Sequence, residues 1–158
     1  MSEIFLRQMD SGDRDLVSHS WLHSYGNDKK TKRIRNHIFW QFLDRKVFFG
    51  IYNHIIDRIL ERSYVLIACD PTNSSEIMGW VCFEKVNDDV NTHLTKNVIV
   101  HYIYVKEPFR HFGIAHKLWD AVTAKGMVTV ITHQTPRVSQ LVSDMGESVN
   151  YRPMKAFE

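Results

Sequence analysis

Apolar and polar positions first follow the period of a strand and then that of a helix. Residues 4–9 alternate apolar and polar side chains, which predicts a half-buried strand. Residues 10–13 supply turn and capping chemistry, and a helix that ends near Gly26 is predicted after them. The apolar positions that recur at helical spacing are Leu16, Val17, Trp21 and Tyr25.

Apolar residues recur at helical spacing between Ile34 and Arg62. Residues 34–49 and 51–62 are predicted to form one or two helices. The apolar face expected for the second segment consists of Ile51, Ile55, Ile56, Ile59 and Leu60.

From Tyr64 onward the pattern becomes that of strands. Residues 64–69 and 77–86 are β-prone, and the turn residues 70–75 between them predict a hairpin. Residues 98–105 carry almost no charge and are the most β-prone stretch of the chain. A strand of this composition is covered on both faces, so we expect it at the centre of the sheet.

The C-terminal third predicts a crossover. Residues 113–125 are expected to form a helix and residues 127–132 a buried strand, so the strands on either side of the helix are predicted to be parallel. The side chains expected to face inward from this helix are Ile114, Leu118, Ala121 and Val122. A short helix over 138–145, stopped by Gly146, and an extended segment over 149–157 complete the chain.

Length and composition predict one globular domain over residues 1–158. A chain of 158 residues has room for a single core, and no internal repeat or linker-like tract interrupts it. No apolar run reaches the roughly 20 residues of a membrane span, and the N-terminus has no signal pattern. The two cysteines, Cys69 and Cys82, look like small strand residues, so we expect a cytoplasmic protein with no membrane association.

The formal net charge of +2 does not by itself indicate a nucleic-acid partner. Five basic residues nevertheless lie within seven positions, close to the aromatic residues Phe39 and Trp40: Lys29, Lys30, Lys32, Arg33 and Arg35. This run is typical either of a solvated loop or of a surface that holds DNA or RNA. Among nine histidines, His19 and His23 have i,i+4 spacing but lack the acidic partner of a zinc motif, so no metal site is predicted.

The segment from His101 to Ala115 carries the chemistry. It is a buried strand, a turn containing Pro108, and a helix start with small residues at Gly113 and Ala115. Free backbone N–H groups at a helix N-terminus attract an anion, and small residues let that anion approach the backbone.

Arg110-x-x-Gly113-x-Ala115 resembles the acetyl-CoA signature of the GNAT (GCN5-related N-acetyltransferase) superfamily, and the order of elements over residues 4–157 is similar to that fold. The resemblance implies an α/β (α+β) fold with a mixed, mostly antiparallel central sheet, a parallel strand–helix–strand unit for acyl-CoA and flanking helices. It also implies acetyl-CoA as cosubstrate. The implied donor-binding residues are Ile103, Tyr104 and Val105 for pantetheine and the acyl group, Arg110 of the signature, and His111, Phe112, Gly113, Ile114, Ala115 and His116 for the pyrophosphate.

The resemblance further implies direct transfer, in which an amine loses a proton and the leaving thiolate gains one. Many members place a tyrosine in the helix after the fifth strand, where this chain has Val142, so Tyr151 or solvent is left as the proton donor. His101 and His133 are the candidate bases because imidazole titrates near neutral pH, although each is equally consistent with a structural role. Tyr102 and Tyr104 share one face of their strand, where core packing is the expected role.

The sequence therefore predicts an acyltransferase that moves an acetyl group from acetyl-CoA to an amine of unidentified acceptor. Two alternatives stay open. The first is a nucleic-acid-modifying enzyme similar to the Mom-type proteins of phages, which would use the five basic residues, and the chain is also similar to small phage-encoded GNAT proteins. The second is a binding module that holds acyl-CoA without turnover.

Overall fold

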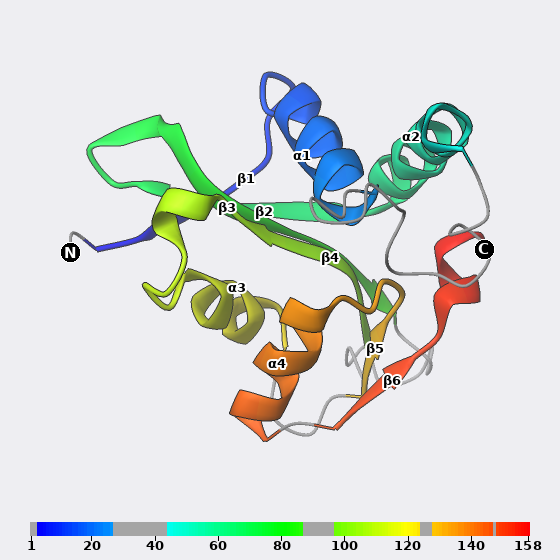
Figure 1. Ribbon diagram of the computed structural model, residues 1–158. Coiled ribbons are helices and arrows are strands. Elements are labelled where there is room, and N and C mark those ends of the chain that lie inside the picture. The colour runs from blue at the N-terminus through cyan, green and yellow to red at the C-terminus, as the bar shows by residue number, and fades with distance from the viewer. Residues whose placement is uncertain (1–2, 27–43, 87–96, 124–127, 147) are drawn as a thin grey trace.

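A computed structural model describes residues 3–26, 44–86, 97–123, 128–146 and 148–158. These residues form one mixed sheet between two layers of helices, with α1 and α2 on one face and α3 and α4 on the other (Figure 1). The strands are β1 (Phe5–Gln8), β2 (Tyr64–Asp70), β3 (Asn73–Val86), β4 (Asn97–Val105), β5 (Val128–Ile131) and β6 (Val149–Tyr151). The helices are α1 (Arg14–Gly26), α2 (Arg45–Arg62), α3 (Ile114–Val122) and α4 (Pro136–Met145).

The six strands lie in the order β1-β2-β3-β4-β5-β6. Strands β1 to β4 pair antiparallel, and β5 runs parallel to both β4 and β6. The predicted hairpin is confirmed as β2–β3, and the predicted crossover is confirmed as β4–α3–β5. The α/β fold class with a mixed sheet is therefore confirmed, and β4 lies inside the sheet, between β3 and β5.

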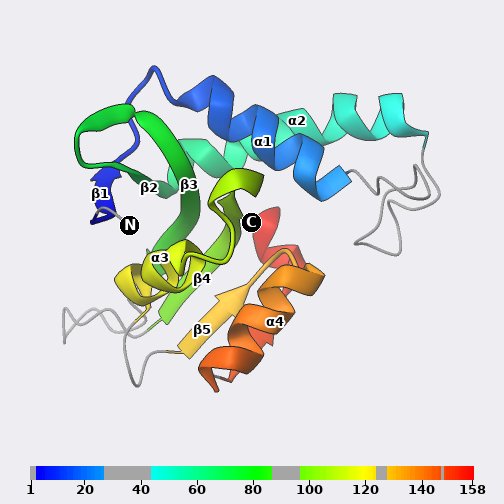
Figure 2. The ribbon, with the colours of Figure 1, turned by 60° about the vertical axis from the view of Figure 1, so that its left-hand side comes forward.

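Each face of the sheet has its own apolar cluster. Trp80, Cys82 and Tyr102 pack under α1 and α2, whereas Val81, Val100 and Ile131 pack under α3 and α4. Figure 2 shows α3 and α4 on the same side of the sheet, along β4 and β5. Burying this apolar surface on both faces of β4 explains why its sequence carries so little charge.

The prediction for α2 was partly wrong. Asp44 caps the helix by accepting a hydrogen bond of 2.8 Å from the Lys46 amide, so α2 begins at Arg45, whereas residues 34–43 of the predicted segment lie outside the described residues. It then continues through Gly50, and Ile51 is 44% exposed instead of buried. The buried face consists of Phe48, Tyr52, Ile56, Ile59 and Leu60.

The prediction for α3 needs a smaller correction. Ile114, Leu118 and Val122 are buried as expected, but Ala121 is exposed and Trp119 takes its place in the core. The helix ends at Val122, because Thr123 is extended and returns its N–H to the Trp119 carbonyl. The helix after β5 stops at Gly146 with φ of 64°, as predicted from its glycine.

Two irregularities shape the centre of the sheet. A Cβ at Gly79 would lie 2.6 Å from the Tyr104 carbonyl oxygen, so only glycine lets β3 approach β4 this closely. In β4, Tyr102 pairs with Cys82 and Val100 pairs with Phe83, which leaves His101 as the extra residue of a β-bulge. The bulge turns the side chains of His101 and Tyr102 to the same face, the one covered by α1 and α2.

No helix in the described part of the chain is both long and apolar enough to span a bilayer.

Candidate active site

The sheet opens where β4 continues beyond β5. The β4–β5 ladder covers Asn97–Val100, and the Thr132 amide adds one bond of 3.3 Å to the Val100 carbonyl. At the far end of β4 the Lys106 amide donates to the Met78 carbonyl, so the alternation of the ladder turns the peptide groups of Ile103 and Val105 away from β3. These peptide groups face the space between the two strands, which we name the β4–β5 opening.

The chain turns sharply between this end of β4 and α3. A 3-10 turn spans Glu107–Phe109, and His111 and Gly113 then have positive φ angles of 69° and 76°. Gly113 precedes α3 in the left-handed conformation that glycine adopts without strain. The first bond along α3 runs from the Lys117 amide to the Gly113 carbonyl, so the amides of Ile114, Ala115 and His116 precede the helix ladder and point out of its positive end.

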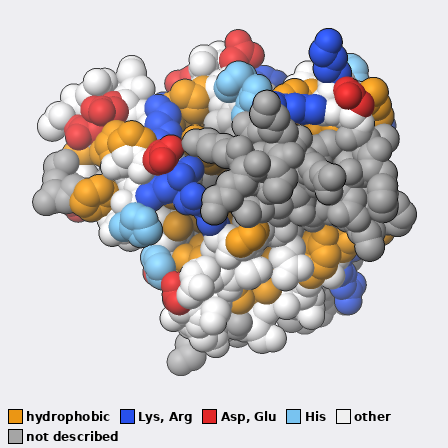
Figure 3. All heavy atoms as spheres, in the orientation of Figure 1, with side chains coloured by type: hydrophobic (Ala, Val, Ile, Leu, Met, Phe, Trp, Pro, Cys, Tyr) orange, Lys and Arg blue, Asp and Glu red, His pale blue; other side chains and the backbone are white. Residues whose placement is uncertain are grey.

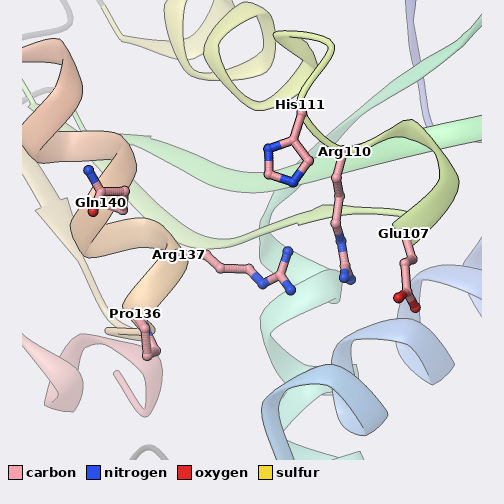
Figure 4. A pocket seen from close by; sticks show the side chains of 6 residues that line it. All are labelled: Glu107, Arg110, His111, Pro136, Arg137 and Gln140. Atoms are coloured by element: carbon pink, nitrogen blue, oxygen red, sulfur yellow. The ribbon is translucent and has the colours of Figure 1, made fainter.

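A pocket of about 520 Å³ lies in front of this turn. It is lined by Glu107, Arg110, His111, Pro136, Arg137 and Gln140. Figure 4 shows the guanidinium groups of Arg110 and Arg137 converging in it, with the His111 ring close by. In Figure 3, Lys and Arg atoms gather beside histidine atoms on the face where the turn before α3 lies in Figure 1.

Two helices begin at this pocket. Thr135 caps α4 by accepting a bond from the Val138 amide, and Pro136 occupies the first turn, so the start of α4 faces the start of α3 across the pocket. The Arg110 Nε donates a 3.0 Å hydrogen bond to the Val105 carbonyl, which ties the pocket to the end of β4. Two guanidinium groups and two positive helix ends make this a site for an anion.

The predicted donor-binding residues divide into two groups. Arg110 and His111 line the pocket, and the amides of Ile114, Ala115 and His116 lie at the helix start. The Tyr104 side chain packs near Trp80 on the α1–α2 face, with ring centroids 6.0 Å apart, so it lies on the other face of the sheet from α3. The predicted shared face of Tyr102 and Tyr104 is confirmed, because both pack against the same apolar cluster.

A second constellation lies on the α1–α2 face, at the end of β5. His133 is 2% exposed and is surrounded by four aromatic rings. The centroids of these rings lie 4.9 to 5.9 Å from that of the imidazole and belong to Tyr25, Trp21, Tyr52 and Tyr102. The Trp21 Nε1 is a buried donor without a hydrogen-bond partner among the described residues.

Hydrogen bonds join this aromatic cluster to the surface. The Tyr52 hydroxyl bonds the Nε2 of His133, and the Nδ1 of His133 lies 2.8 Å from the Thr132 hydroxyl. The same hydroxyl lies 2.9 Å from the Nδ1 of His101. The Nε2 of His101 is 2.8 Å from Glu84 Oε1, and that oxygen accepts a 2.8 Å bond from the Nε of Arg62.

Burial and neighbouring polar groups have opposite effects on the pKa values of these hydrogen-bonded residues. Burial lowers the pKa of His101 even though the Glu84 carboxylate opposes that effect, so the ring is neutral near pH 7. Burial alone would raise the pKa of Glu84, but the hydrogen bonds from His101 and Arg62 outweigh it, and the pKa is lowered. Burial raises the pKa of Tyr52 well above its ordinary value and that of Tyr102 to about 12.

Tyr151 lies at the edge of the same cluster. It pairs with Ile131 at the end of β6 and is 39% exposed. Its charge raises the pKa of both Tyr25 and Tyr52, so the three phenols are within electrostatic reach of one another. Val142, at the position where related chains have a tyrosine, packs against the core under α4.

The structure thus brings the three predicted catalytic residues into one region. His101 and His133 share the Thr132 hydroxyl, and the charge of Tyr151 acts on the pKa of Tyr25 and Tyr52, two of the tyrosines that surround His133. Sequence reasoning missed Tyr52 and Arg137. A helix phase counted from Arg45 would have placed Tyr52 in line with Ile56, and the Thr-Pro start of α4 was a signal for a second helix N-terminus.

Two other sequence predictions, a basic surface for nucleic acid and no metal site, stay predictions. The basic residues Lys29, Lys30, Lys32, Arg33 and Arg35 lie outside the described residues, so the nucleic-acid interpretation stays untested. Within the described ranges, no three His, Cys, Asp or Glu side chains form a group that would hold a metal ion.

Comparison with known families decides the classification. The model of the acetyltransferase (GNAT) family matches residues 20–130, which is more than half of the chain. The chain belongs to this family. Members transfer an acyl group from acetyl-CoA, so acetyl-CoA is the donor, and the pocket between α3 and α4 is the candidate donor site. No curated protein sequence matches the chain.

Solved structures support the fold. An aminoglycoside N-acetyltransferase AAC(6')-Iy in complex with CoA is 19% identical, with 96% of this chain and 92% of that chain covered and a TM-score of 0.53. A ribosomal-protein-alanine N-acetyltransferase from Brucella melitensis biovar Abortus 2308 is 19% identical, with 95% and 94% covered and a TM-score of 0.57. A GCN5-related N-acetyltransferase from Ralstonia eutropha JMP134 is 14% identical, with 95% of each chain covered and a TM-score of 0.61.

Proposed function

We propose that this protein transfers the acetyl group of acetyl-CoA to an amine, with the donor held at the β4–β5 opening and the amine arriving from the α1–α2 face. The observation that carries the proposal is the convergence of Arg110 and Arg137 in a pocket between two helix N-termini, directly beside peptide groups of β4 that face away from β3.

The residues present fit the chemistry of the donor. The amides of Ile114, Ala115 and His116 and the two guanidinium groups match a pyrophosphate, because anions bind where N–H groups and positive charge converge. The peptide groups of Ile103 and Val105 would hold the amide-rich pantetheine arm in the manner of an added strand. When bound, acetyl-CoA supplies the thioester carbon that the amine attacks.

We assign the role of base to His133. It lies where β4 and β5 part, on the face of the sheet covered by α1 and α2. The amine must lose a proton to become a nucleophile, and a neutral imidazole is suited to accept it near pH 7. In this arrangement the proton reaches Nε2 of His133 through the Tyr52 hydroxyl, which passes on its own proton as it receives one.

For the leaving thiolate, Tyr151 is the proposed proton source. It is partly exposed near the tyrosines that surround His133, and burial raises its pKa, so the phenol keeps its proton at neutral pH. A phenol is a far stronger acid than the hydroxyls of Ser139 and Ser143 on α4, the helix that carries the family's tyrosine position.

The test of the proposed function is titration calorimetry with acetyl-CoA, followed by mass spectrometry of protein, small-amine and DNA acceptors. Arg137→Gln removes one of the two converging charges and should weaken acetyl-CoA binding about 10- to 100-fold, since a hydrogen bond to a charged group contributes about 1.5–3 kcal/mol. The matched control is Arg58→Gln, an exposed arginine on α2, which should bind normally. Equal affinities for the two variants would place the donor elsewhere.

A further inference from the structure

Six polar side chains form a continuous hydrogen-bonded path across the α1–α2 face. It runs from Tyr52 on α2 through the two residues that follow β5 and one residue of β4 to β3, and it returns to the C-terminal end of α2. In order, the members are Tyr52, His133, Thr132, His101, Glu84 and Arg62. Burying so many polar groups is costly unless each is paired, and here each is paired with the next.

The exposure of the members changes from one end to the other. Tyr52 and His133 are each 2% exposed, and the His101 side chain has no exposed surface. The Glu84 and Arg62 side chains, at the other end, are 21% and 30% exposed. The path therefore links a closed aromatic cluster with a carboxylate that reaches water.

The carboxylate gives the path a single direction. Ionised Glu84 only accepts, so His101 carries its proton on Nε2 and its Nδ1 accepts from the Thr132 hydroxyl. The Thr132 contact with this nitrogen, at 2.9 Å, is shorter than its 3.4 Å contact with the His101 carbonyl. Thr132 then accepts from Nδ1–H of His133, and the Nε2 of His133 is left to accept from Tyr52.

We propose that this path is a proton relay, in which Thr132, His101 and Glu84 carry the proton taken from the acceptor amine at Tyr52 and His133 to solvent beside Arg62. The inference rests on the proposed function for the source of the proton. Thr132, His101 and Glu84 are positioning residues, because they act through His133.

Each transfer balances. The amine gives a proton to the Tyr52 oxygen as Tyr52 gives its own to Nε2 of His133, and Nδ1 of His133 gives its proton to Thr132. Thr132 in turn protonates Nδ1 of His101, and the Nε2 proton of His101 passes to Glu84. The net change is a neutral amine and a protonated Glu84, which returns the proton to water, after which the hydroxyls and ring tautomers reset. No redox step or metal takes part.

Two features of the sheet make the path continuous. The bulge at His101 turns this side chain to the same face as Tyr102 and toward Glu84 on β3. The end of the β4–β5 ladder at Thr132 lets its hydroxyl lie between the two imidazoles. The Thr132 hydroxyl therefore joins the two rings, so removing its oxygen is the most direct way to interrupt the path.

The variants for the test differ at that oxygen. Thr132→Val keeps the shape and removes the hydroxyl, and Thr132→Ser keeps the hydroxyl. Thr129→Val is the matched control, because Thr129 lies on the preceding strand β5, is buried to a similar extent and is outside the path. We expect T132V to lower kcat about 10- to 100-fold, a part of the 100- to 10,000-fold effect of a general base, with an unchanged acetyl-CoA Kd. T132S should return kcat to within about threefold of wild type, and T129V should match wild type.

Glu84→Gln interrupts the path at a second point, because it removes the carboxylate that would receive the proton. It should lower kcat in the wild-type background and have no further effect in the T132V background, because the path is already broken there. Additive losses, a T132V enzyme with wild-type kcat, or a T132S enzyme as slow as T132V would overturn the relay.

NMR spectroscopy tests the proposed relay without a measurement of turnover. Nitrogen-15 NMR of the imidazoles should show His133 protonated on Nδ1, and E84Q should shift the pKa of His133 only when Thr132 is present. The titratable groups that face the two rings are Tyr25, Tyr52, Arg62, Glu84, Tyr102 and Tyr151. In the comparison of E84Q with wild type, Glu84 is the only one of these groups that is changed.

The outcomes of the two arms separate the two proposals. Wild-type protein that acetylates no amine would contradict the proposed function, while the coupling of Glu84 to His133 would still support the path. An unchanged His133 resonance in E84Q would overturn the relay whatever the turnover. If T132V fails to reach the wild-type near-UV circular dichroism, the E84Q titration decides alone.

Discussion

We propose Tyr151 as the general acid because the helix after β5 offers no tyrosine. The position at which the family resemblance places a tyrosine, on the helix after β5, holds Val142, which is partly buried against the core and has no proton to give. Tyr151 lies on β6, one strand further along the sheet than β5, and its charge raises the pKa of Tyr25 and Tyr52. Moving the acid from a helix to a neighbouring strand would keep the phenol near the thiolate while leaving α4 free to fill the core.

Tyr151→Phe keeps the ring and removes the proton. We expect turnover to fall about 100- to 10,000-fold with unchanged acetyl-CoA affinity, because a positioned general acid contributes about that much. Steady-state kinetics and calorimetry measure the two quantities. Tyr64→Phe, at an exposed tyrosine on β2, is the control, and wild-type turnover in Tyr151→Phe would leave solvent as the proton source.

At the level of elements, the proposed donor site depends on the start of α3. Gly113 has a φ of 76°, and a Cβ placed there would meet no atom within 4 Å, so a longer side chain would project into open space at the positive end of the helix. Gly113→Glu should abolish acetyl-CoA binding because its carboxylate would compete with the pyrophosphate for the same N–H groups.

Backbone strain is the competing explanation for such a loss, and Gly113→Asn separates the two. Asparagine tolerates positive φ and carries no charge, so this variant should retain most of the affinity. Calorimetry on both variants, with thermal unfolding as a check of the fold, compares charge with strain. Equal affinity of Gly113→Glu and wild type would remove the donor site from this helix.

The join between β1 and α1 makes stability depend on pH. Asp13 accepts bonds of 2.6 and 3.0 Å from Arg7 and one of 2.9 Å from the Asp10 amide, and the Arg7 bond in particular lowers its pKa. Because the folded pKa lies below the unfolded value of about 3.9, the stabilisation is complete above that value and is lost as the pH falls through the folded pKa.

Asp13→Asn should therefore lower the free energy of unfolding by about 2 kcal/mol at pH 7, which is typical of a hydrogen bond to a charged group. The difference from wild type should begin to shrink below about pH 4 and should continue to shrink as the pH falls through the lowered pKa of folded Asp13. Urea unfolding at several pH values measures it. Asp15→Asn, on an exposed side chain of the same helix, is the control, and a difference that stays constant with pH would exclude the ionic contribution.

For the whole molecule, periodicity predicted the sheet better than it predicted the site. The uncharged run of β4 and the parallel crossover followed from local pattern, because strand order along this chain is also strand order in space. The bulge at His101 and the meeting of Arg137 with Arg110 depend on how β4 pairs with β3 and where α4 begins relative to α3. Such relations between distant segments leave no periodic signal in the sequence.

The last prediction concerns the charge distribution of the molecule. If the five basic residues from Lys29 to Arg35 hold nucleic acid and not the donor, replacing all five with Gln should leave acetyl-CoA affinity unchanged. If the acceptor is DNA or RNA, these residues would neutralise phosphates, and log K would fall with log salt with a slope of roughly 0.9 per phosphate contact on duplex DNA. The five-residue variant should then flatten that slope, as measured by fluorescence anisotropy between 50 and 200 mM salt, a range over which about six or more contacts change affinity by roughly 1,000-fold or more. A wild-type protein with no affinity for nucleic acid at low salt would exclude the nucleic-acid acceptor and leave small amines and protein amines as the substrates to test.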